Sequence, residues 1–141
     1  MIEIPAGSLD EWLEPLKPFQ RSHLAAFLAH EEPEAAAQDW LSSTGSSQII
    51  PFGGVPNPNP FWDRFRLEFR RFVCDDSAYV EEKQALIAEA GPATKAILIS
   101  GISAAIGATI GYSATLLAPA VALLLYVIAK MGLRAYCNVD V

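Results

Sequence analysis

Two histidines and two cysteines are the side chains of this chain best suited to metal binding or nucleophilic chemistry. His23 and His30 lie seven residues apart and could share one helix face, with Glu34 four residues further on. Pro33 interrupts any helix between His30 and Glu34, because proline lacks the amide hydrogen and clashes with the preceding turn. A metal site needs three or four converging ligands, so we expect no metal and no other cofactor, and two solvent-facing histidines.

The two cysteines stand alone, without the C-x-x-C spacing of zinc ligands or redox pairs. Cys74 precedes Asp75 and Asp76, and an acidic setting disfavours the thiolate that a nucleophile needs. Cys137 follows Tyr136 and is assigned to packing. The sequence therefore predicts neither a disulfide framework nor a zinc site.

Motifs of common enzymes are missing from the sequence. It contains no G-x-x-x-x-G-K-[ST], no H-E-x-x-H and no G-x-S-x-G. We therefore expect a protein that is not an enzyme and has no catalytic or cofactor-binding residues. The net charge is -6, and residues 1–40, with eight acidic residues against Lys17 and Arg21, account for the whole excess, which disfavours nucleic acid as a partner. The first residues form no secretory signal, so a cytoplasmic soluble part is the default.

A group of arginines precedes the first cysteine. One interpretation is a basic helix face that lies among lipid headgroups or binds an acidic partner. The other is an ordinary solvated surface, on which the arginines pair with Asp63 and Glu68 at helical spacing. The candidate basic surface consists of Arg64, Arg66, Arg70 and Arg71.

Short helices are expected over residues 1–41. Ser8 followed by Glu11 matches a capping box, Pro18 suits the start of a second helix, and a third helix should run through Ala36 and Leu41. Residues 42–60 are rich in Ser, Gly and Pro and are expected to be a linker. Residues 61–91 are expected to form amphipathic helices. The first of these should bury one face, made of Phe61, Phe65, Phe69, Phe72 and Val73.

The longest pattern is a run of 34 residues without a charge, from Ala96 to Ala129, between Lys95 and Lys130. As one helix it would be about 50 Å long, against roughly 30 Å for the hydrocarbon core of a bilayer. We therefore predict a hydrophobic helical hairpin over residues 92–137. Its turn is expected at Gly111-Tyr112-Ser113, and its second arm from Pro119 to Met131.

Small residues recur every fourth position along the first arm and into the second. Such spacing lets two helices approach closely in a membrane, and equally in the interior of a soluble bundle. The candidate helix-packing face consists of Ser103, Gly107, Gly111 and Thr115. In composition, the arms between Ile97 and Leu133 resemble the hydrophobic helices of pore-forming peptides and small membrane-acting toxins. That resemblance implies an action on membranes.

Together these patterns predict an all-α protein, a small helical domain followed by a C-terminal hydrophobic helical hairpin. The leading hypothesis is a membrane-associated protein without catalytic activity. Its hairpin would anchor it in, or permeabilise, the cell membrane, and its cytoplasmic N-terminal domain would bind a partner. The alternative is a cytoplasmic, soluble structural or adaptor subunit of an assembly, with the hairpin buried in a helical bundle. The expected partners are membrane lipid or another protein, and the expected state is an oligomer or a complex.

Overall fold

The computed structural model describes residues 4–44, 60–90 and 94–139 of the chain. These residues form eight helices and no strand, which confirms the predicted all-α class. In chain order the helices are α1 (Leu9–Leu13), α2 (Pro18–Leu28), α3 (Pro33–Thr44), α4 (Pro60–Cys74), α5 (Val80–Ala90), α6 (Lys95–Ile110), α7 (Ala114–Met131) and α8 (Leu133–Val139).

The first two N-terminal helices begin where the sequence predicts, at the Ser8 cap and at Pro18, whereas α3 begins at Pro33, which was expected only to end α2. Ser8 Oγ accepts a hydrogen bond from the amide of Glu11 at 3.2 Å, and the Glu11 carboxylate accepts one from the amide of Ser8 at 2.8 Å. This confirms the capping box of α1. Prolines open α2 and α3, at Pro18 and Pro33, where the missing amide hydrogen has no helical partner to lose.

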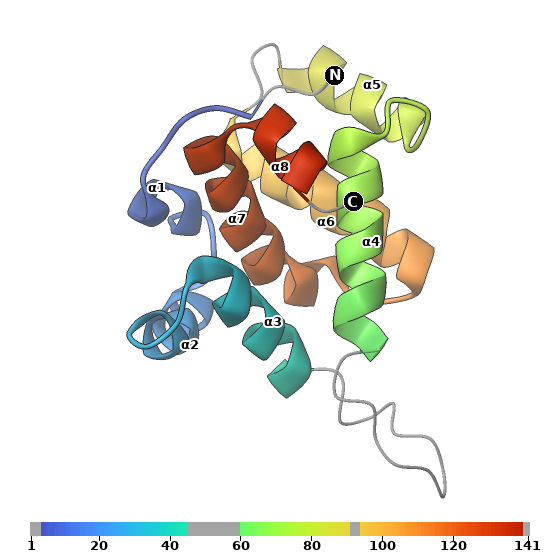
Figure 1. Ribbon diagram of the computed structural model, residues 1–141. Coiled ribbons are helices and arrows are strands. Elements are labelled where there is room, and N and C mark those ends of the chain that lie inside the picture. The colour runs from blue at the N-terminus through green and yellow to red at the C-terminus, as the bar shows by residue number, and fades with distance from the viewer. Residues whose placement is uncertain (1–3, 45–59, 91–93, 140–141) are drawn as a thin grey trace, which may run out of the picture.

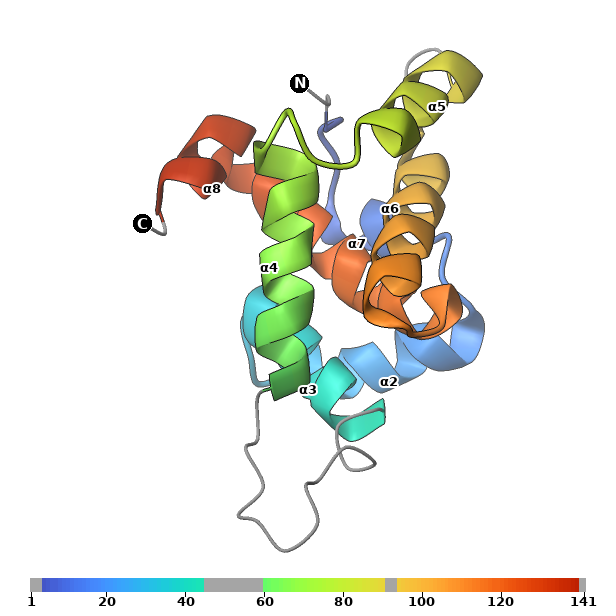
Figure 2. The same cartoon turned by 90° about the vertical axis from the view of Figure 1, so that its right-hand side faces the viewer.

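Helix α7 lies in the middle of the bundle (Figure 1). Helices α1, α2, α3, α6 and α8 of the same chain all contact it, while α4 packs against α3, α6 and α8. In the view turned by 90°, α4 runs across one side of the bundle and α5 and α6 follow each other on another (Figure 2). The most apolar helix is therefore surrounded by the more polar ones.

The predicted hairpin is present as α6 and α7, which pack against each other. Gly111 ends α6 in the left-handed conformation, with a φ of 76°. The amides of Gly111 and Tyr112 both donate to the main-chain oxygen of Gly107, at 2.8 and 2.9 Å, as in a Schellman-type helix end. The predicted turn at Gly111-Tyr112-Ser113 is confirmed.

The second arm begins earlier than predicted. Helix α7 starts at Ala114, so Pro119 lies inside it and not at its first turn. A proline cannot donate to the carbonyl four residues before it, which here is that of Thr115. The side chain of Gln20 supplies the missing donor, because its Nε2 lies 3.0 Å from the Thr115 oxygen. A neighbouring helix thus makes the interior proline tolerable.

One continuous core joins the N-terminal helices to the hairpin. On α4, the predicted face is buried at Phe65, Phe69, Phe72 and Val73, while the side chain of Phe61 lies outside the described part. Full burial of each phenylalanine contributes on the order of 1.5–3 kcal/mol. The predicted division into segments 1–41, 42–60, 61–91 and 92–137 stays a prediction. Most of its linker, residues 45–59, and the Gly91-Pro92 boundary lie outside the described residues.

Candidate functional site

The hairpin is the candidate site, and its second arm is the core of the bundle. Leu117, the run from Pro119 to Leu125, and Ile128 are all buried in α7. Only Lys130, in the last turn, carries a charge. Helix α7 is long and apolar enough to cross a membrane, although the core helix of a soluble protein meets the same criterion. Length and composition alone therefore give weak support for membrane association.

The first arm is apolar but lies at the surface of the bundle. One face of α6 is buried through Leu98, Ile102 and Ile106. The opposite face is exposed and carries neither a charged nor a large side chain. A helix surface in contact with water normally carries charges, so this exposed uncharged face is an exception. Its residues are spaced by four and are Ala96, Ser100, Ala104 and Ala108.

The four residues of the predicted helix-packing face occupy different environments. Ser103 and Gly107 are buried, whereas Thr115 is exposed. A Cβ atom on Gly107 would stand 2.5 Å from the main-chain oxygen of Tyr112, so the close approach there is to the turn of the hairpin itself. A Cβ atom on Gly111 would have no neighbour within 4 Å, and the positive φ accounts for this glycine. A role of the four residues as one interface stays a prediction.

The four arginines of the candidate basic surface have separate surroundings on α4. Arg64 is exposed, and Arg66 forms an ion pair with Glu34 of α3, with 3.5 Å between Nε and Oε1. Arg71 pairs with Glu68 of its own helix at 3.2 Å. Arg70 reaches α8, as described next. Three of the four thus have partners within the protein, and lipid binding by the set stays a prediction.

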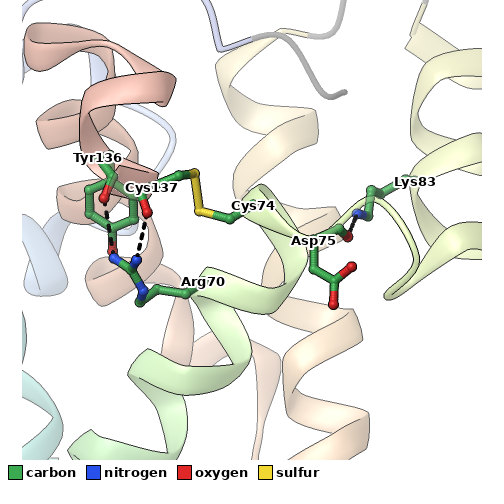
Figure 3. The surroundings of a disulfide bond; sticks show 6 residues. All are labelled: Arg70, Cys74, Asp75, Lys83, Tyr136 and Cys137. Carbon is green, nitrogen blue, oxygen red and sulfur yellow. Dashed lines mark hydrogen bonds between the residues drawn. A yellow bond between two sulfur atoms is a disulfide. The ribbon is translucent and has the colours of Figure 1, made fainter. Parts of the chain in front are cut away.

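A disulfide and an arginine link α4 to α8 (Figure 3). Cys74 and Cys137 form a disulfide with their Cα atoms 5.7 Å apart, which corrects our expectation of two unlinked cysteines. Spacing along the chain could not reveal it, because the two cysteines are 63 residues apart. Next to the disulfide, Arg70 donates to the main-chain oxygens of Tyr136 and Cys137 at 3.2 and 3.1 Å. We call these contacts the α4–α8 link.

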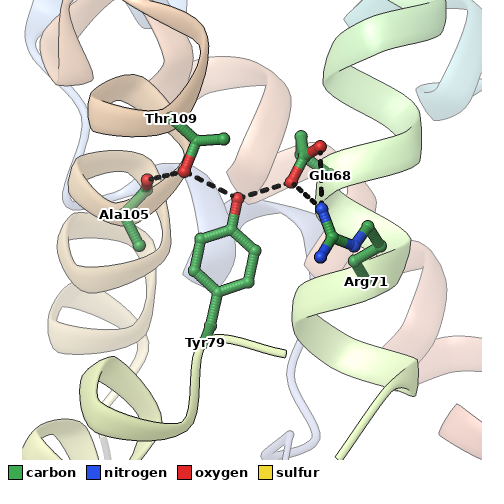
Figure 4. A network of polar contacts seen from close by, with 5 residues as sticks. All are labelled: Glu68, Arg71, Tyr79, Ala105 and Thr109. Atoms are coloured by element: carbon green, nitrogen blue, oxygen red, sulfur yellow. Dashed lines mark hydrogen bonds and ion pairs between the residues drawn. The ribbon is translucent and has the colours of Figure 1, made fainter. Parts of the chain in front are cut away.

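A second set of polar contacts links α4 to α6 (Figure 4). Tyr79 donates a hydrogen bond of 2.6 Å to the carboxylate of Glu68 on α4, and its oxygen lies 3.0 Å from Thr109 Oγ1 on α6. Thr109 also donates to the main-chain oxygen of Ala105 at 3.1 Å. Burial, followed by the hydrogen bond to Glu68, raises the pKa of Tyr79 to about 12. We call this set the α4–α6 network.

The backbone of Tyr79 is left-handed, with a φ of 55°. This conformation costs a bulky residue roughly 1–2 kcal/mol. This backbone conformation directs the Tyr79 ring, just before α5, into the space between α4 and α6. The centroid of the ring lies 5.1 Å from that of Phe72. Strained positions of this kind persist only where surrounding contacts hold them, as Glu68 and Thr109 do here.

The described residues contain no group of three or more His, Cys, Asp or Glu side chains that could hold a metal ion. His23 and His30 are both exposed, as predicted, and His23 stacks on Phe27. A surface cavity of about 430 Å³ borders the α4–α6 network, but the Glu68 carboxylate that lines it is engaged by Arg71 and Tyr79. Comparison with protein-family models, curated proteins and solved structures finds no match to this chain.

Proposed function

We propose that this protein associates with membranes through the α6–α7 hairpin, without catalysing a reaction. In water the other helices of the protein cover α7, and at a membrane the hairpin inserts into the bilayer. The observation that carries the proposal is the uncharged exposed face of α6, Ala96, Ser100, Ala104 and Ala108, next to α7, which has no charge before Lys130 in its last turn. In a bilayer, a helix without charged side chains is favourable on every face.

The dimensions of the hairpin support insertion. Helix α7, at 18 residues, is about 27 Å long, and α6, at 16 residues, is about 24 Å long. A hydrocarbon core is roughly 30 Å thick, so α7 is near the lower limit for a span and α6 is slightly shorter. Small bilayer adjustments absorb a mismatch of a few ångströms.

The positive charges favour one orientation. Lys95 begins α6 and Lys130 lies in the last turn of α7, so an antiparallel hairpin places both at the same end, with Arg134 close by in α8. Lysines and arginines next to a span favour the cytoplasmic side. We therefore propose that the N-terminal helices face the cytoplasm when the hairpin is inserted.

A second candidate function is that of a subunit in a soluble assembly. Burial of α7 by helices of the same chain favours it, since such a helix needs no lipid. In that case the exposed small-residue face of α6 would receive a helix of a partner protein, because small side chains allow close approach.

Vesicle flotation of the full chain separates the two candidates. We expect the wild type to float with vesicles of mixed zwitterionic and anionic phospholipids. The bound protein should not be extracted from them by alkaline carbonate. Ala104→Asp places a charge at the middle of α6, which costs roughly 2.5–3.5 kcal/mol in a bilayer, so vesicle binding should fall at least about 50-fold. Ala26→Asp is the matched control, because Ala26 is also exposed and lies within α2. A wild-type chain that stays monodisperse in buffer and never floats would favour the soluble subunit.

A further inference from the structure

The Cys74–Cys137 disulfide closes a covalent ring that contains the whole hairpin. Cys74 is the last residue of α4, and Cys137 lies in α8, with α5, α6 and α7 between them in the chain. A cross-link of this kind restricts how far the enclosed segment can separate from the cross-linked helices. Movement of α7 away from α4 is therefore limited as long as the disulfide is intact.

Restraint of α8 is passed directly to α7. Gly132 is the only residue between the two helices, and its φ of 96° sets the bend between them. Tyr136 of α8 is buried, and its ring packs edge to face against that of Phe69 on α4, with 6.1 Å between the ring centroids. The α4–α8 link thus fixes the C-terminal end of α7, a helix whose middle, from Pro119 to Leu125, is a continuous run of buried apolar residues.

The two cysteines lie at the edge of the core and not in its interior. Cys74 and Cys137 are both only partly buried. Without the disulfide, the link would keep the two hydrogen bonds from Arg70 and the aromatic contact, which are all reversible. Hydrogen bonds from a charged guanidinium are stronger than neutral ones, but they exchange with bonds to water and can break without any covalent change.

We propose that the Cys74–Cys137 disulfide is a redox latch on the hairpin, with the oxidised form closed and the reduced form competent to insert. This inference rests on the proposed membrane function. A dithiol reductant gives two electrons and two protons to the sulfur atoms. The S–S bond breaks, Cys74 and Cys137 become thiols, and the dithiol becomes a disulfide. Helix α8 can then leave α4, and α7 can leave the bundle.

The latch reconciles two features that otherwise conflict. Disulfides persist in oxidising compartments and are rare in the cytosol. The lysines at the ends of the hairpin, Lys95 and Lys130, favour a cytoplasmic location of that end when it is inserted. With a redox latch, the protein is closed under oxidising conditions, where the disulfide persists. It inserts where a reducing cytoplasm converts the disulfide to thiols.

The test compares oxidised and reduced full-length protein in two measurements. The first is amide hydrogen exchange without lipid, and the second is flotation with the mixed vesicles. We expect reduction by a dithiol to accelerate exchange in α8 and the C-terminal half of α7 at least about tenfold, and to raise vesicle binding. The variant Cys74→Ser/Cys137→Ser should show the exchange rates and vesicle binding of the reduced protein, and neither should change when the reductant is added. Arg70→Gln, with the disulfide intact, is the control that weakens the same link without removing the cross-link.

The outcomes separate the latch from the membrane function. Vesicle binding and exchange that are equal in both redox states would overturn the latch and leave the membrane function standing. Faster exchange on reduction, with no vesicle binding in either state, would refute the membrane function and with it the insertion-competent reduced form, and would leave the disulfide only as a restraint on α7 and α8. Alkylation of both cysteines in the untreated, non-reduced protein would overturn the latch directly.

Discussion

Gln20 of α2 donates its side-chain hydrogen bond to the main-chain oxygen of Thr115, the acceptor that Pro119 leaves unused in α7. Gln20 is almost fully buried, and its Oε1 in turn accepts a bond from the amide of Lys17 at 3.2 Å. A side chain from one helix thereby repairs the hydrogen bonding of another. The relationship ties the N-terminal helices to the hairpin and leads to a specific test.

Gln20→Leu should lower the free energy of unfolding by about 1–3 kcal/mol, because the Thr115 oxygen loses its donor. In a Pro119→Ala background the loss should be smaller, since the new amide of residue 119 can bond to that oxygen. Chemical denaturation of the four proteins gives the coupling energy. Strictly additive effects would show that Gln20 does not compensate for the proline.

Gly107→Ala should destabilise the hairpin, because its Cβ would stand 2.5 Å from the main-chain oxygen of Tyr112 and backbone cannot easily yield. Gly107→Leu should be worse. Gly101→Ala is the matched control, since the atom 2.5 Å from its Cβ is the end of the flexible Leu86 side chain. We expect a loss of roughly 1–3 kcal/mol for Gly107→Ala and clearly less for Gly101→Ala in thermal unfolding. Equal losses would contradict this account of the turn.

Phe69→Ala should cost about 3–5 kcal/mol, because Phe69 is fully buried and its truncation leaves a cavity. Arg66→Ala, on the half-exposed side of the same helix, removes the partly exposed ion pair with Glu34 and should cost about 0–1 kcal/mol. Thermal unfolding of the two variants measures the difference. If the arginine variant were as unstable as the phenylalanine variant, the ion pair between α4 and α3 would contribute more to the free energy of unfolding than a partly exposed pair normally does.

Alkaline pH should destabilise the protein through Tyr136. Burial, helped by the nearby carboxylate of Glu34, raises the pKa of Tyr136 to about 12. A free tyrosine ionises near pH 10, so this stabilisation is complete below about pH 10 and is lost as the pH rises toward about 12. Wild-type stability should therefore fall by up to roughly 2–3 kcal/mol more than that of Tyr136→Phe over this interval. Parallel pH profiles from chemical denaturation would exclude a contribution from this hydroxyl.

Local signals in the sequence determined the helices and the turn of the hairpin. The capping box at Ser8, the prolines that open α2 and α3, and the buried phenylalanine face of α4 each depend on residues close together in the chain. Helix caps and apolar periodicity involve residues only a few positions apart in the sequence, so these features can be predicted without knowing the tertiary contacts. Gly111 is the clearest case, because a positive φ selects glycine locally.

Only the tertiary structure decided which distant residues meet. The disulfide joins Cys74 to Cys137, Tyr79 lies between Glu68 and Thr109, and Gln20 reaches Thr115 across 95 residues. Tertiary structure also placed the other helices of this chain around α7. The sequence could establish only that α7 avoids water up to Lys130 in its last turn, because an apolar helix can be surrounded equally well by lipid or by protein side chains. Which of these surrounds it depends on the rest of the fold.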